Sequence, residues 1–225
     1  MNQDKIFYKK EGDEWFNRNK DYISEHKCDK DFPIKVIEML GLKPEKTLEI
    51  GASNGYRLAE LSKKLEKGTY VAVEPSKKAI EDREKKYPFI DFRRGLMYNL
   101  PIEDEKFDLV IVNFVFHWVE REHLLRSVAE TDRVLNNKGY LIIGDFLPDV
   151  PTKVKYHHLP NKSVYTYKQD YANIFISSKQ YNLILRHTCD HDSNAVSSEF
   201  DSNSRGVCSC LKKNQDGKYI KKKFE

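Results

Sequence analysis

Long hydrophobic segments are missing from this chain of 225 residues, and cysteine is scarce. The longest purely apolar runs, such as 109–112, are far shorter than the roughly 20 residues that a helix needs to cross a bilayer. Residues 1–15 lack the apolar core of a signal peptide. The four cysteines, two of which are separated by one residue, do not form the pattern of a secreted disulfide framework. These absences predict a cytoplasmic protein with no membrane span.

A large excess of either charge is also missing. Lys and Arg total 39 against 35 for Asp and Glu, which gives a formal net charge of +4. Apart from the short basic tail at 213–225, no basic stripe with interleaved aromatic residues is present, so we expect no nucleic-acid partner. With 39% apolar and 33% charged residues, the composition excludes intrinsic disorder, and the length fits one domain.

Short apolar segments alternate with segments of helical spacing through the first two thirds of the chain. Segments rich in β-branched and aromatic residues predict strands at 47–51, 69–74, 89–93, 107–113 and 139–146. Helical spacing of apolar residues predicts helices at 14–23, 33–42, 58–65 and 124–135. Strands that alternate with helices indicate a parallel sheet with helices on both faces.

The pattern changes after Asp145. Residues 146–168 contain three prolines and two adjacent histidines, which favours a long connection, and a short helix is expected at 168–176. Strands predicted at 181–189 and 205–212 flank a loop rich in Ser, Asp and Asn at 190–204, so they should form an antiparallel hairpin. The predicted fold is therefore α/β. It is a doubly wound, Rossmann-like sheet of seven mostly parallel strands with an antiparallel C-terminal hairpin.

The turn after the first predicted strand reads GASNG at 51–55. Its small residues let the backbone pass close to a ligand. Glu74, 19 residues after Gly55, ends the second predicted strand. Both positions lie at the carboxyl edge of a doubly wound sheet, in the crevice where ligands bind. A carboxylate there can accept two hydrogen bonds from a ribose diol, so the pair predicts a cofactor that contains a nucleoside.

A turn that binds a diphosphate needs glycine at the first, third and sixth positions of G-x-G-x-x-G. Those positions hold Gly51, Ser53 and Tyr56 here, so two of the three fail. The turn therefore favours a cofactor with a ribose but no phosphate, such as S-adenosylmethionine. A nicotinamide-dependent oxidoreductase is kept as an alternative.

Five segments resemble the class I S-adenosylmethionine-dependent methyltransferases in their order and spacing. They read LEIGASNG (48–55), VAVEPS (71–76), FRRGLMYNLP (92–101), FDLVIVNFVFHWV (107–119) and RVLNNKGYLIIGDF (133–146). More loosely, 11–19, 156–160 and 163–171 resemble a bacterial subgroup associated with surface-carbohydrate pathways. The resemblance implies an enzyme of class EC 2.1.1.- that methylates a small-molecule acceptor and releases S-adenosylhomocysteine. It places the methyl group on an oxygen of a sugar, a nucleotide-linked sugar or a surface-polysaccharide precursor.

The resemblance also assigns roles at the cofactor site. The methionine end would be lined by Gly51, Ala52, Ser53 and Gly55. Glu49 would help to hold the ammonium group, directly or through water, and Glu74 would accept the ribose hydroxyls.

The resemblance also implies residues from the following loops that contact the adenine and the sulfonium. The residues implied are Pro75, Ser76, Leu96 and Met97 around the adenine, and Asn113 and Phe114 near the sulfonium. Many family members carry Asp where this chain has Leu96, so the main chain must bind the adenine amino group in its place.

Three histidines are candidate general bases for an alcohol acceptor. His117 follows the fourth predicted strand, and the alternative is a histidine that is hydrogen-bonded at a helix start. His157 and His158 lie in the connection after the fifth strand, which could fold over the mouth of the site; otherwise they are loop or substrate-contact residues. Asp145 ends the fifth strand, where it could orient a histidine, bind the acceptor or cap a helix.

Other residues are candidate acceptor contacts. Tyr167 and Lys168 could touch an anionic acceptor or belong to a solvated loop, and Trp15 could cover the site or only dock its helix. We predict a helical lid at 1–30 and a methyltransferase domain at 31–225, in which 146–180 lies on the substrate side.

Two further patterns limit the chemistry. The segment NFVF at 113–116 differs from the N-P-P-aromatic box associated with methylation of nucleobase amines and amides. Cys208 and Cys210 lie near Cys189 and His191 in the predicted hairpin, but C-x-C spacing is not that of a zinc site. We therefore predict buried reduced cysteines and no metal. A binding module without catalysis remains an alternative function, and the oligomeric state is left open.

Overall fold

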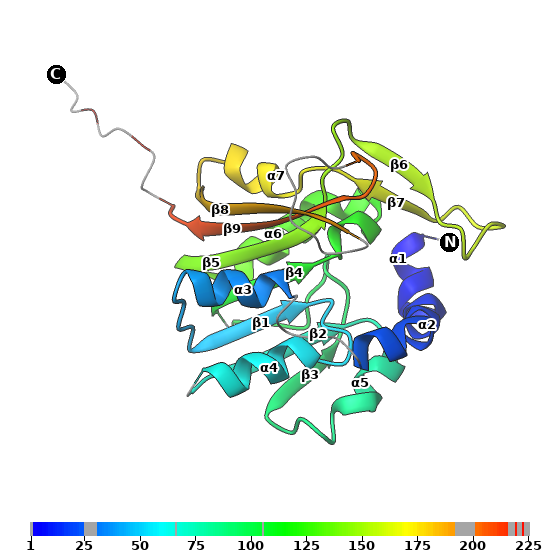
Figure 1. Cartoon of the computed structure of the whole chain (residues 1–225), viewed down its shortest axis with the longest axis horizontal. Coiled ribbons are helices and arrows are strands. Elements are labelled where there is room, and N and C mark those ends of the chain that lie inside the picture. The colour runs from blue at the N-terminus through cyan, green and yellow to red at the C-terminus, as the bar shows by residue number, and fades with distance from the viewer. Residues whose placement is uncertain are drawn as a thin grey trace.

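Seven strands form one sheet in a computed structural model, which describes residues 2–24, 31–65, 67–104, 106–191 and 201–215, with Tyr219 and Lys222 (Figure 1). The strands are β1 (Lys46–Ile50), β2 (Thr69–Glu74), β3 (Ile90–Arg94), β4 (Phe107–Asn113), β5 (Leu135–Phe146), β8 (Tyr181–Asp190) and β9 (Arg205–Lys213). Their order in the sheet is β3-β2-β1-β4-β5-β9-β8. The first five are parallel, whereas β9 runs antiparallel to both β5 and β8. The predicted fold class is confirmed.

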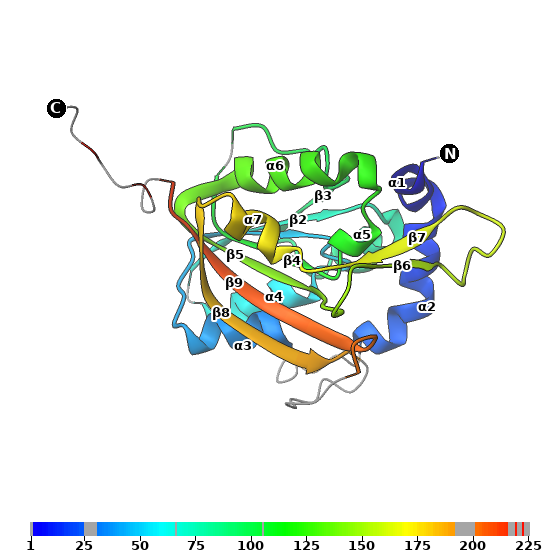
Figure 2. The ribbon, with the colours of Figure 1, turned by 90° about the horizontal axis from the view of Figure 1, so that it is seen from above.

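Helices cover both faces of this sheet (Figure 2). On one face lie α6 (Leu124–Val134) and α7 (Ala172–Ser177), and on the other lie α3 (Phe32–Met39) and α4 (Tyr56–Lys64). Successive side chains of β4 point into two different cores. Val110 and Val112 belong to the core under α6 and α7, and Leu109 and Ile111 to the core under α3 and α4. A strand buried on both faces is continuously apolar where it is buried, as residues 109–112 of β4 show.

Several predicted boundaries are wrong. The helix over 124–135 ends at Val134, because Leu135 already begins β5 and pairs with Phe107. The connection at 146–168 contains an antiparallel hairpin, β6 (Thr152–Lys155) and β7 (Tyr165–Lys168). Its four-residue strands are exposed or half-buried along their whole length, so they lack the apolar alternation that marks a strand. The helix expected at 168–176 therefore begins later, at Ala172.

The N-terminal helical segment begins at Gln3, well before the predicted helix at 14–23. It consists of α1 (Gln3–Ile6), a π-helical turn η1 (Phe7–Glu11) and α2 (Gly12–Ser24). Figures 1 and 2 show this segment and the β6–β7 hairpin beyond the carboxyl ends of the parallel strands. Phe16 of α2 packs with Ala79 of α5 (Lys77–Arg83), which joins the segment to the main sheet domain.

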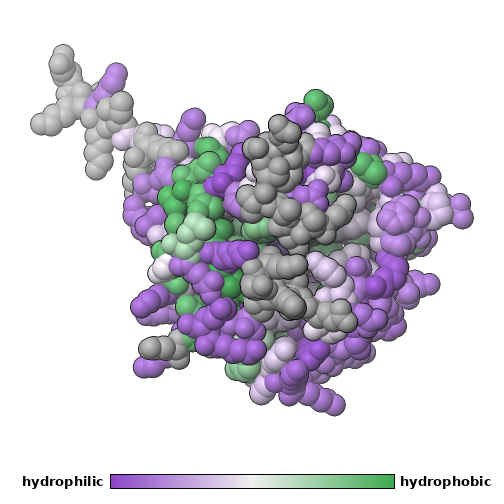
Figure 3. Space-filling view, in the orientation of Figure 1, coloured by the Kyte–Doolittle hydropathy of each residue, from purple (hydrophilic) through white to green (hydrophobic). Residues whose placement is uncertain are grey.

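The side of the molecule that carries the N-terminal segment and the hairpin is mostly hydrophilic in Figure 3, where hydrophobic residues gather over the opposite side, near β8 and α3. Within the described ranges, no helix combines the length and the hydrophobicity needed to cross a membrane. Most of the predicted loop at 190–204 and most of the tail at 213–225 lie outside the described residues.

Candidate active site

A cavity of about 730 Å³ lies at the carboxyl ends of the parallel strands. The loops that follow β1 to β5 form its inner wall, and the N-terminal segment and the β6–β7 hairpin form its outer wall. Doubly wound sheets bind ligands at this edge. The volume is in the range of cavities that hold small molecules and cofactors.

The turn after β1 is held close to its neighbours. Gly51 has a φ of 73°, in the left-handed region that favours glycine. A Cβ on Gly51 would lie 2.3 Å from Cγ2 of Val115 in the loop after β4. Ser53 is also left-handed, with a φ of 51°, and its buried Oγ has no hydrogen-bond partner among the described residues. A strained residue with an unpaired buried hydroxyl at a cavity wall is typical of a ligand site.

Glu74 lies beside this turn at the end of β2. Its Oε2 accepts a hydrogen bond from the backbone N–H of Ser53 at 2.8 Å, and its Oε1 accepts one from the N–H of Ser76 at 2.9 Å. Burial raises the pKa of Glu74 to about 7, although these two N–H groups oppose the rise. Each carboxylate oxygen can accept a second hydrogen bond. Glu74 can therefore bind two adjacent hydroxyls.

Glu49 lies behind the wall, in a buried ion cluster. Its Oε1 accepts a hydrogen bond from Nη1 of Arg57, and its Oε2 has no partner among the described residues. The Nε of Arg57 also donates to both carboxylate oxygens of Asp31, at 3.0 and 2.9 Å. Burial is the main reason that the pKa of Glu49 is raised, while Arg57 opposes the rise. Because Arg57 and Asp31 line the cavity, the cluster presents both signs of charge, which suits an amino-acid zwitterion.

The wall beyond β2 and β3 is mainly apolar, with Pro75, Leu96 and Met97. The N-terminal segment is fixed to this wall by Asp13 of α2. Its Oδ1 accepts hydrogen bonds from Oγ of Ser76 at 2.7 Å and from the N–H of Lys78 at 3.1 Å. Ser76 thus caps α5 and binds α2 instead of lining the cavity.

His117 and Asp145 form a buried pair at the ends of β4 and β5. His117 lies in the 3-10 turn η3 (Phe116–Trp118), and its Nδ1 donates to Oδ1 of Asp145 at 2.9 Å. The backbone N–H of His117 donates to Oδ2 of Asp145 at 3.2 Å. With its proton on Nδ1, the ring keeps a lone pair on Nε2, which has no partner among the described residues. Since His117 lines the cavity and Asp145 does not, the pair presents an oriented base to a ligand.

Aromatic rings surround this base. The rings of Phe114, Phe146 and Trp118 lie 6.1, 5.1 and 4.7 Å from the imidazole of His117. Phe114 is left-handed, with a φ of 56°, and its N–H donates to the carbonyl of Gly144 at 2.7 Å. The rings give the imidazole apolar surroundings and offer flat faces to a bound molecule.

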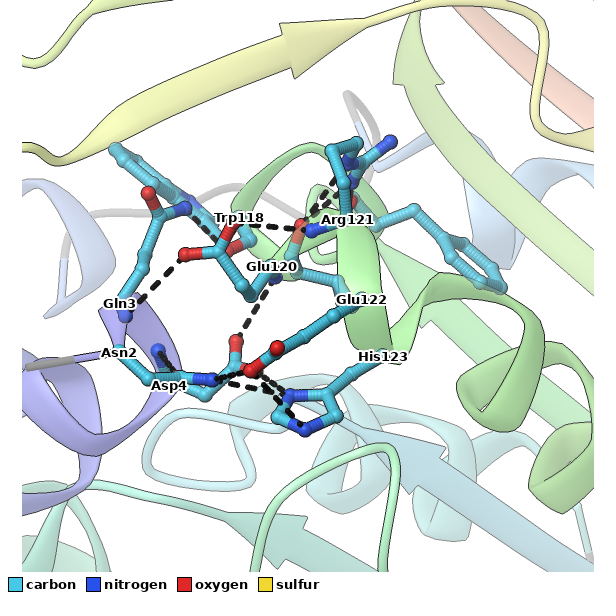
Figure 4. A network of polar contacts seen from close by, with 10 residues as sticks. Asn2, Gln3, Asp4, Trp118, Glu120, Arg121, Glu122 and His123 are labelled. Carbon is cyan, nitrogen blue, oxygen red and sulfur yellow. Dashed lines mark hydrogen bonds and ion pairs between the residues drawn. The ribbon is translucent and has the colours of Figure 1, made fainter.

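The outer wall is fixed by polar contacts between segments far apart in sequence. Figure 4 shows Gln3 and Asp4 of α1 directed toward residues 118–123. The Nε2 of Gln3 donates to the carbonyls of Trp118 at 2.6 Å and Tyr165 at 2.8 Å, while Asp4 accepts from the N–H of Glu120 at 3.0 Å. Gln3 thereby joins α1, the loop after β4 and the hairpin into one cover over the cavity.

Most of the predicted site residues line this cavity. They are Trp15, Gly51, Ala52, Ser53, Glu74, Pro75, Leu96, Met97, Asn113, Phe114, His117, His157, His158 and Lys168. Those placed outside its lining are Glu49, Gly55, Ser76, Asp145 and Tyr167. The ring of Tyr167 instead lies under the guanidinium of Arg121, at 4.3 Å from its centroid. The roles assigned to these residues stay predictions.

Sequence reasoning missed several residues of the wall. Arg57 lies two residues after the glycine turn. Its place in the wall could have been predicted, because a basic residue soon after the strand that carries Glu49 can pair with that carboxylate. Phe146 and Tyr156 gave no such indication, because their neighbours come from distant segments. The cysteines agree with expectation in one respect: Cys189, Cys208 and Cys210 are free and buried.

Comparisons with known proteins agree with this geometry. Residues 48–143 match the methyltransferase domain family. A phthiotriol/phenolphthiotriol dimycocerosates methyltransferase of Mycobacterium ulcerans is 33% identical over 109 residues, covering 48% of this chain and 40% of its own. A demethylmenaquinone methyltransferase of Thermotoga maritima is 34% identical over 116 residues, covering 51% and 49%. The chain thus spans less than half the length of these two relatives.

Solved structures share the fold. The 1,6-didemethyltoxoflavin-N1-methyltransferase of Burkholderia thailandensis, solved with its acceptor and S-adenosylhomocysteine, has a TM-score of 0.68 at 12% identity. The similarity covers 89% of this chain and 84% of that one. An S-adenosylmethionine-dependent methyltransferase of Clostridium acetobutylicum has a TM-score of 0.62 at 15% identity, covering 90% and 98%.

The sheet, its site at the carboxyl edge and these similarities define a class I methyltransferase fold. The resemblance to class I S-adenosylmethionine-dependent methyltransferases that the sequence predicted is confirmed over residues 48–143 and in the fold. The carbohydrate-associated subgroup stays a prediction.

The described residues fit S-adenosylmethionine. Glu74 keeps two acceptor positions that a ribose diol would fill, and Arg57 with Asp31 carries charges of both signs that would suit the amino-acid end. The unpaired Oγ of Ser53 and the close backbone approach at Gly51 leave a narrow polar cradle between them.

Gly51→Ala tests this cradle. The positive φ alone should destabilise the protein by about 1–2 kcal/mol, and the clash with Val115 should add to that loss and weaken binding of S-adenosylhomocysteine. Urea unfolding and calorimetric titration measure the two effects.

Gly41→Ala is the matched control, because Gly41 has a φ of 59° and a Cβ added to it would meet no atom within 4 Å. It should show the backbone strain without loss of affinity. Equal losses of stability and unchanged affinity in both variants would contradict a close approach at Gly51.

Proposed function

We propose that this chain is an S-adenosylmethionine-dependent methyltransferase that methylates a hydroxyl of a small-molecule acceptor. The observation that carries the proposal is the His117–Asp145 pair, because His117 lines the same cavity as the glycine turn and Glu74 while its Nδ1 is bound to Asp145. A base at this position is needed for an alcohol, which is a weak nucleophile while it holds its proton.

The protein's residues divide the work of the reaction. When bound, S-adenosylmethionine supplies a methyl group on a positively charged sulfur. Glu74 and the turn at Gly51 fix the cofactor, and the aromatic rings around His117 exclude water from the acceptor. His117 Nε2 would take the hydroxyl proton as the acceptor oxygen bonds to the methyl carbon and the carbon–sulfur bond breaks, which would release S-adenosylhomocysteine. Asp145 would stabilise the resulting imidazolium. Alignment of the reacting atoms can lower the barrier by about 7–11 kcal/mol in favourable cases.

For the acceptor itself, we retain a sugar, a nucleotide-linked sugar or a surface-polysaccharide precursor as the proposed class. Its support is the loose resemblance of 11–19, 156–160 and 163–171, and the last two of these stretches lie in or beside the β6–β7 hairpin. The two relatives described above carry names that refer to other acceptors, a phthiotriol lipid and demethylmenaquinone.

Calorimetric titration and a turnover assay test the proposal. The protein should bind S-adenosylhomocysteine and not NAD, and it should release S-adenosylhomocysteine from S-adenosylmethionine when a hydroxylated acceptor is present. The acceptor panel should contain each compound with its O-methylated counterpart as the control.

NAD binding alone would overturn the proposal in favour of an oxidoreductase. Tight binding of S-adenosylhomocysteine with no turnover across the panel would instead identify a binding module without catalysis.

A further inference from the structure

The β6–β7 hairpin has a one-sided charge. Its 17 residues from Thr152 to Lys168 include four lysines and two histidines, and neither aspartate nor glutamate. The rest of the chain is close to balanced, since the formal net charge of the whole protein is only +4. Such a segment over a ligand cavity raises the local concentration of anions.

Part of this segment faces the cavity. Lys155, His157, His158 and Lys168 line it, and we call these four residues the basic wall. Its positive charge comes from the two lysines, because partial burial lowers the pKa of His158 and favours the neutral imidazole. The acidic residues that line the cavity are Asp4, Asp31 and Glu74, and they come from α1, the start of α3 and the end of β2. In the described part of the cavity lining, the hairpin contributes only basic or uncharged groups.

The acidic lining residues already have partners of their own. Asp4 accepts a hydrogen bond from Nδ1 of His123, Asp31 pairs with Arg57, and Glu74 accepts two backbone N–H groups. None of the described carboxylates lies within ion-pair distance of Lys155. Lys155 therefore brings an uncompensated positive charge to the cavity.

The basic wall is close to the proposed base. The Nζ of Lys168 lies 3.9 Å from the centroid of the Phe146 ring, and that ring lies 5.1 Å from the imidazole of His117. The rings of His157 and His158 lie 3.9 Å apart at the turn of the hairpin, beside Tyr156. One small molecule can therefore reach His117 with a hydroxyl and the hairpin with its other end.

We propose that the acceptor carries an anionic group, a phosphate or a carboxylate, which the basic wall binds while the hydroxyl of the acceptor reaches His117. This inference deepens the proposed function and rests on it for the position of the hydroxyl. It narrows the acceptor class to hydroxylated compounds with a phosphate or carboxylate and a body that fits against aromatic faces.

Binding of simple probes tests the wall without methyl transfer. The protein, free and saturated with S-adenosylhomocysteine, is titrated with phenyl phosphate, benzoate and benzyl alcohol while tryptophan fluorescence is followed, because Trp118 lines the cavity. At least one anionic probe should bind more tightly than benzyl alcohol. Tighter binding of phenyl phosphate identifies a phosphate-bearing acceptor, and tighter binding of benzoate a carboxylate-bearing one.

The double variant Lys155→Gln/Lys168→Gln should weaken binding of the preferred anion by about tenfold or more, because charge-assisted hydrogen bonds are lost. Lys162→Gln is the matched control, since it removes the same charge from the same hairpin at an exposed position outside the cavity lining. It should leave the dissociation constant unchanged.

Equal affinity for benzyl alcohol and both anions, or an equal loss in the Lys162→Gln control, would overturn the inference. The titration does not depend on turnover. A protein that binds the anion through Lys155 and Lys168 but shows no methyl transfer would therefore contradict the proposed function and still support the anion site.

Discussion

His117→Asn should lower the rate of methyl transfer by about 10²–10⁴-fold, the usual contribution of a positioned general base. The Asn amide can still donate to Asp145, as Nδ1 of the imidazole does, but it has no group at the position of Nε2. The fold and the cofactor site should therefore persist while the base is lost. The rate is measured as S-adenosylhomocysteine released with an acceptor found in the panel, and cofactor affinity by calorimetry.

His187→Asn is the matched control, because His187 of β8 packs against Phe32 and lies outside the cavity lining. Its rate should equal that of the unmodified protein. A full rate in His117→Asn would exclude His117 as the base and leave His157 and His158 as candidates.

Asp145→Asn separates positioning from catalysis. Asp145 acts through His117, so its loss should lower the rate of methyl transfer and leave the affinity for S-adenosylhomocysteine unchanged, because the imidazole loses the acceptor that orients it. A residue with a purely structural role would lower the rate and the cofactor affinity together.

The sheet could be predicted because its central strands are buried on both faces and therefore contain runs of apolar residues, as 109–112 shows. The cofactor edge could be predicted because the glycine turn and Glu74 belong to one strand–helix–strand unit, in which both follow or end a parallel strand at the same edge of the sheet. Both patterns are formed by residues that lie close together in the sequence, so they can be recognised without the structure.

The outer wall could not be predicted in the same way. The strands of the β6–β7 hairpin are too short and too exposed to produce an apolar period, and Gln3 reaches partners more than one hundred positions away. The orientation of His117 likewise depends on Asp145, which is adjacent only because β4 and β5 pair in the sheet. These contacts are set by tertiary packing, which a single sequence does not display.

Glu74→Ala should weaken binding of S-adenosylhomocysteine by about 1–3 kcal/mol, because a charged acceptor of two ribose hydroxyls is lost. Glu74→Gln keeps the size of the side chain and one acceptor oxygen, so its loss should be smaller. Calorimetric titration at pH 8 measures both. Glu81→Gln on the exposed side of α5 is the control for a lost carboxylate, and it should bind normally. Equal affinity of Glu74→Ala and the unmodified protein would exclude the ribose role.

Because burial raises the pKa of Glu74 to about 7, this residue should make both the free energy of unfolding and the cofactor affinity depend on pH, in opposite directions. In the cofactor-free protein, the folded state holds a proton between pH 4.5 and 7 that the unfolded chain has already released, so the free energy of unfolding should fall as the pH rises through this interval. Affinity for S-adenosylhomocysteine should move the other way and rise by about tenfold from pH 6 to pH 8, because the ribose hydroxyls need the ionised carboxylate. Glu74→Gln should flatten both trends, and Glu49, whose pKa is also raised, accounts for the slope that remains. If Glu74→Gln flattens both pH dependences, Glu74 is the buried carboxylate that causes them. It would then stay partly protonated in the cofactor-free protein, until the ribose hydroxyls donate hydrogen bonds that favour its ionised form.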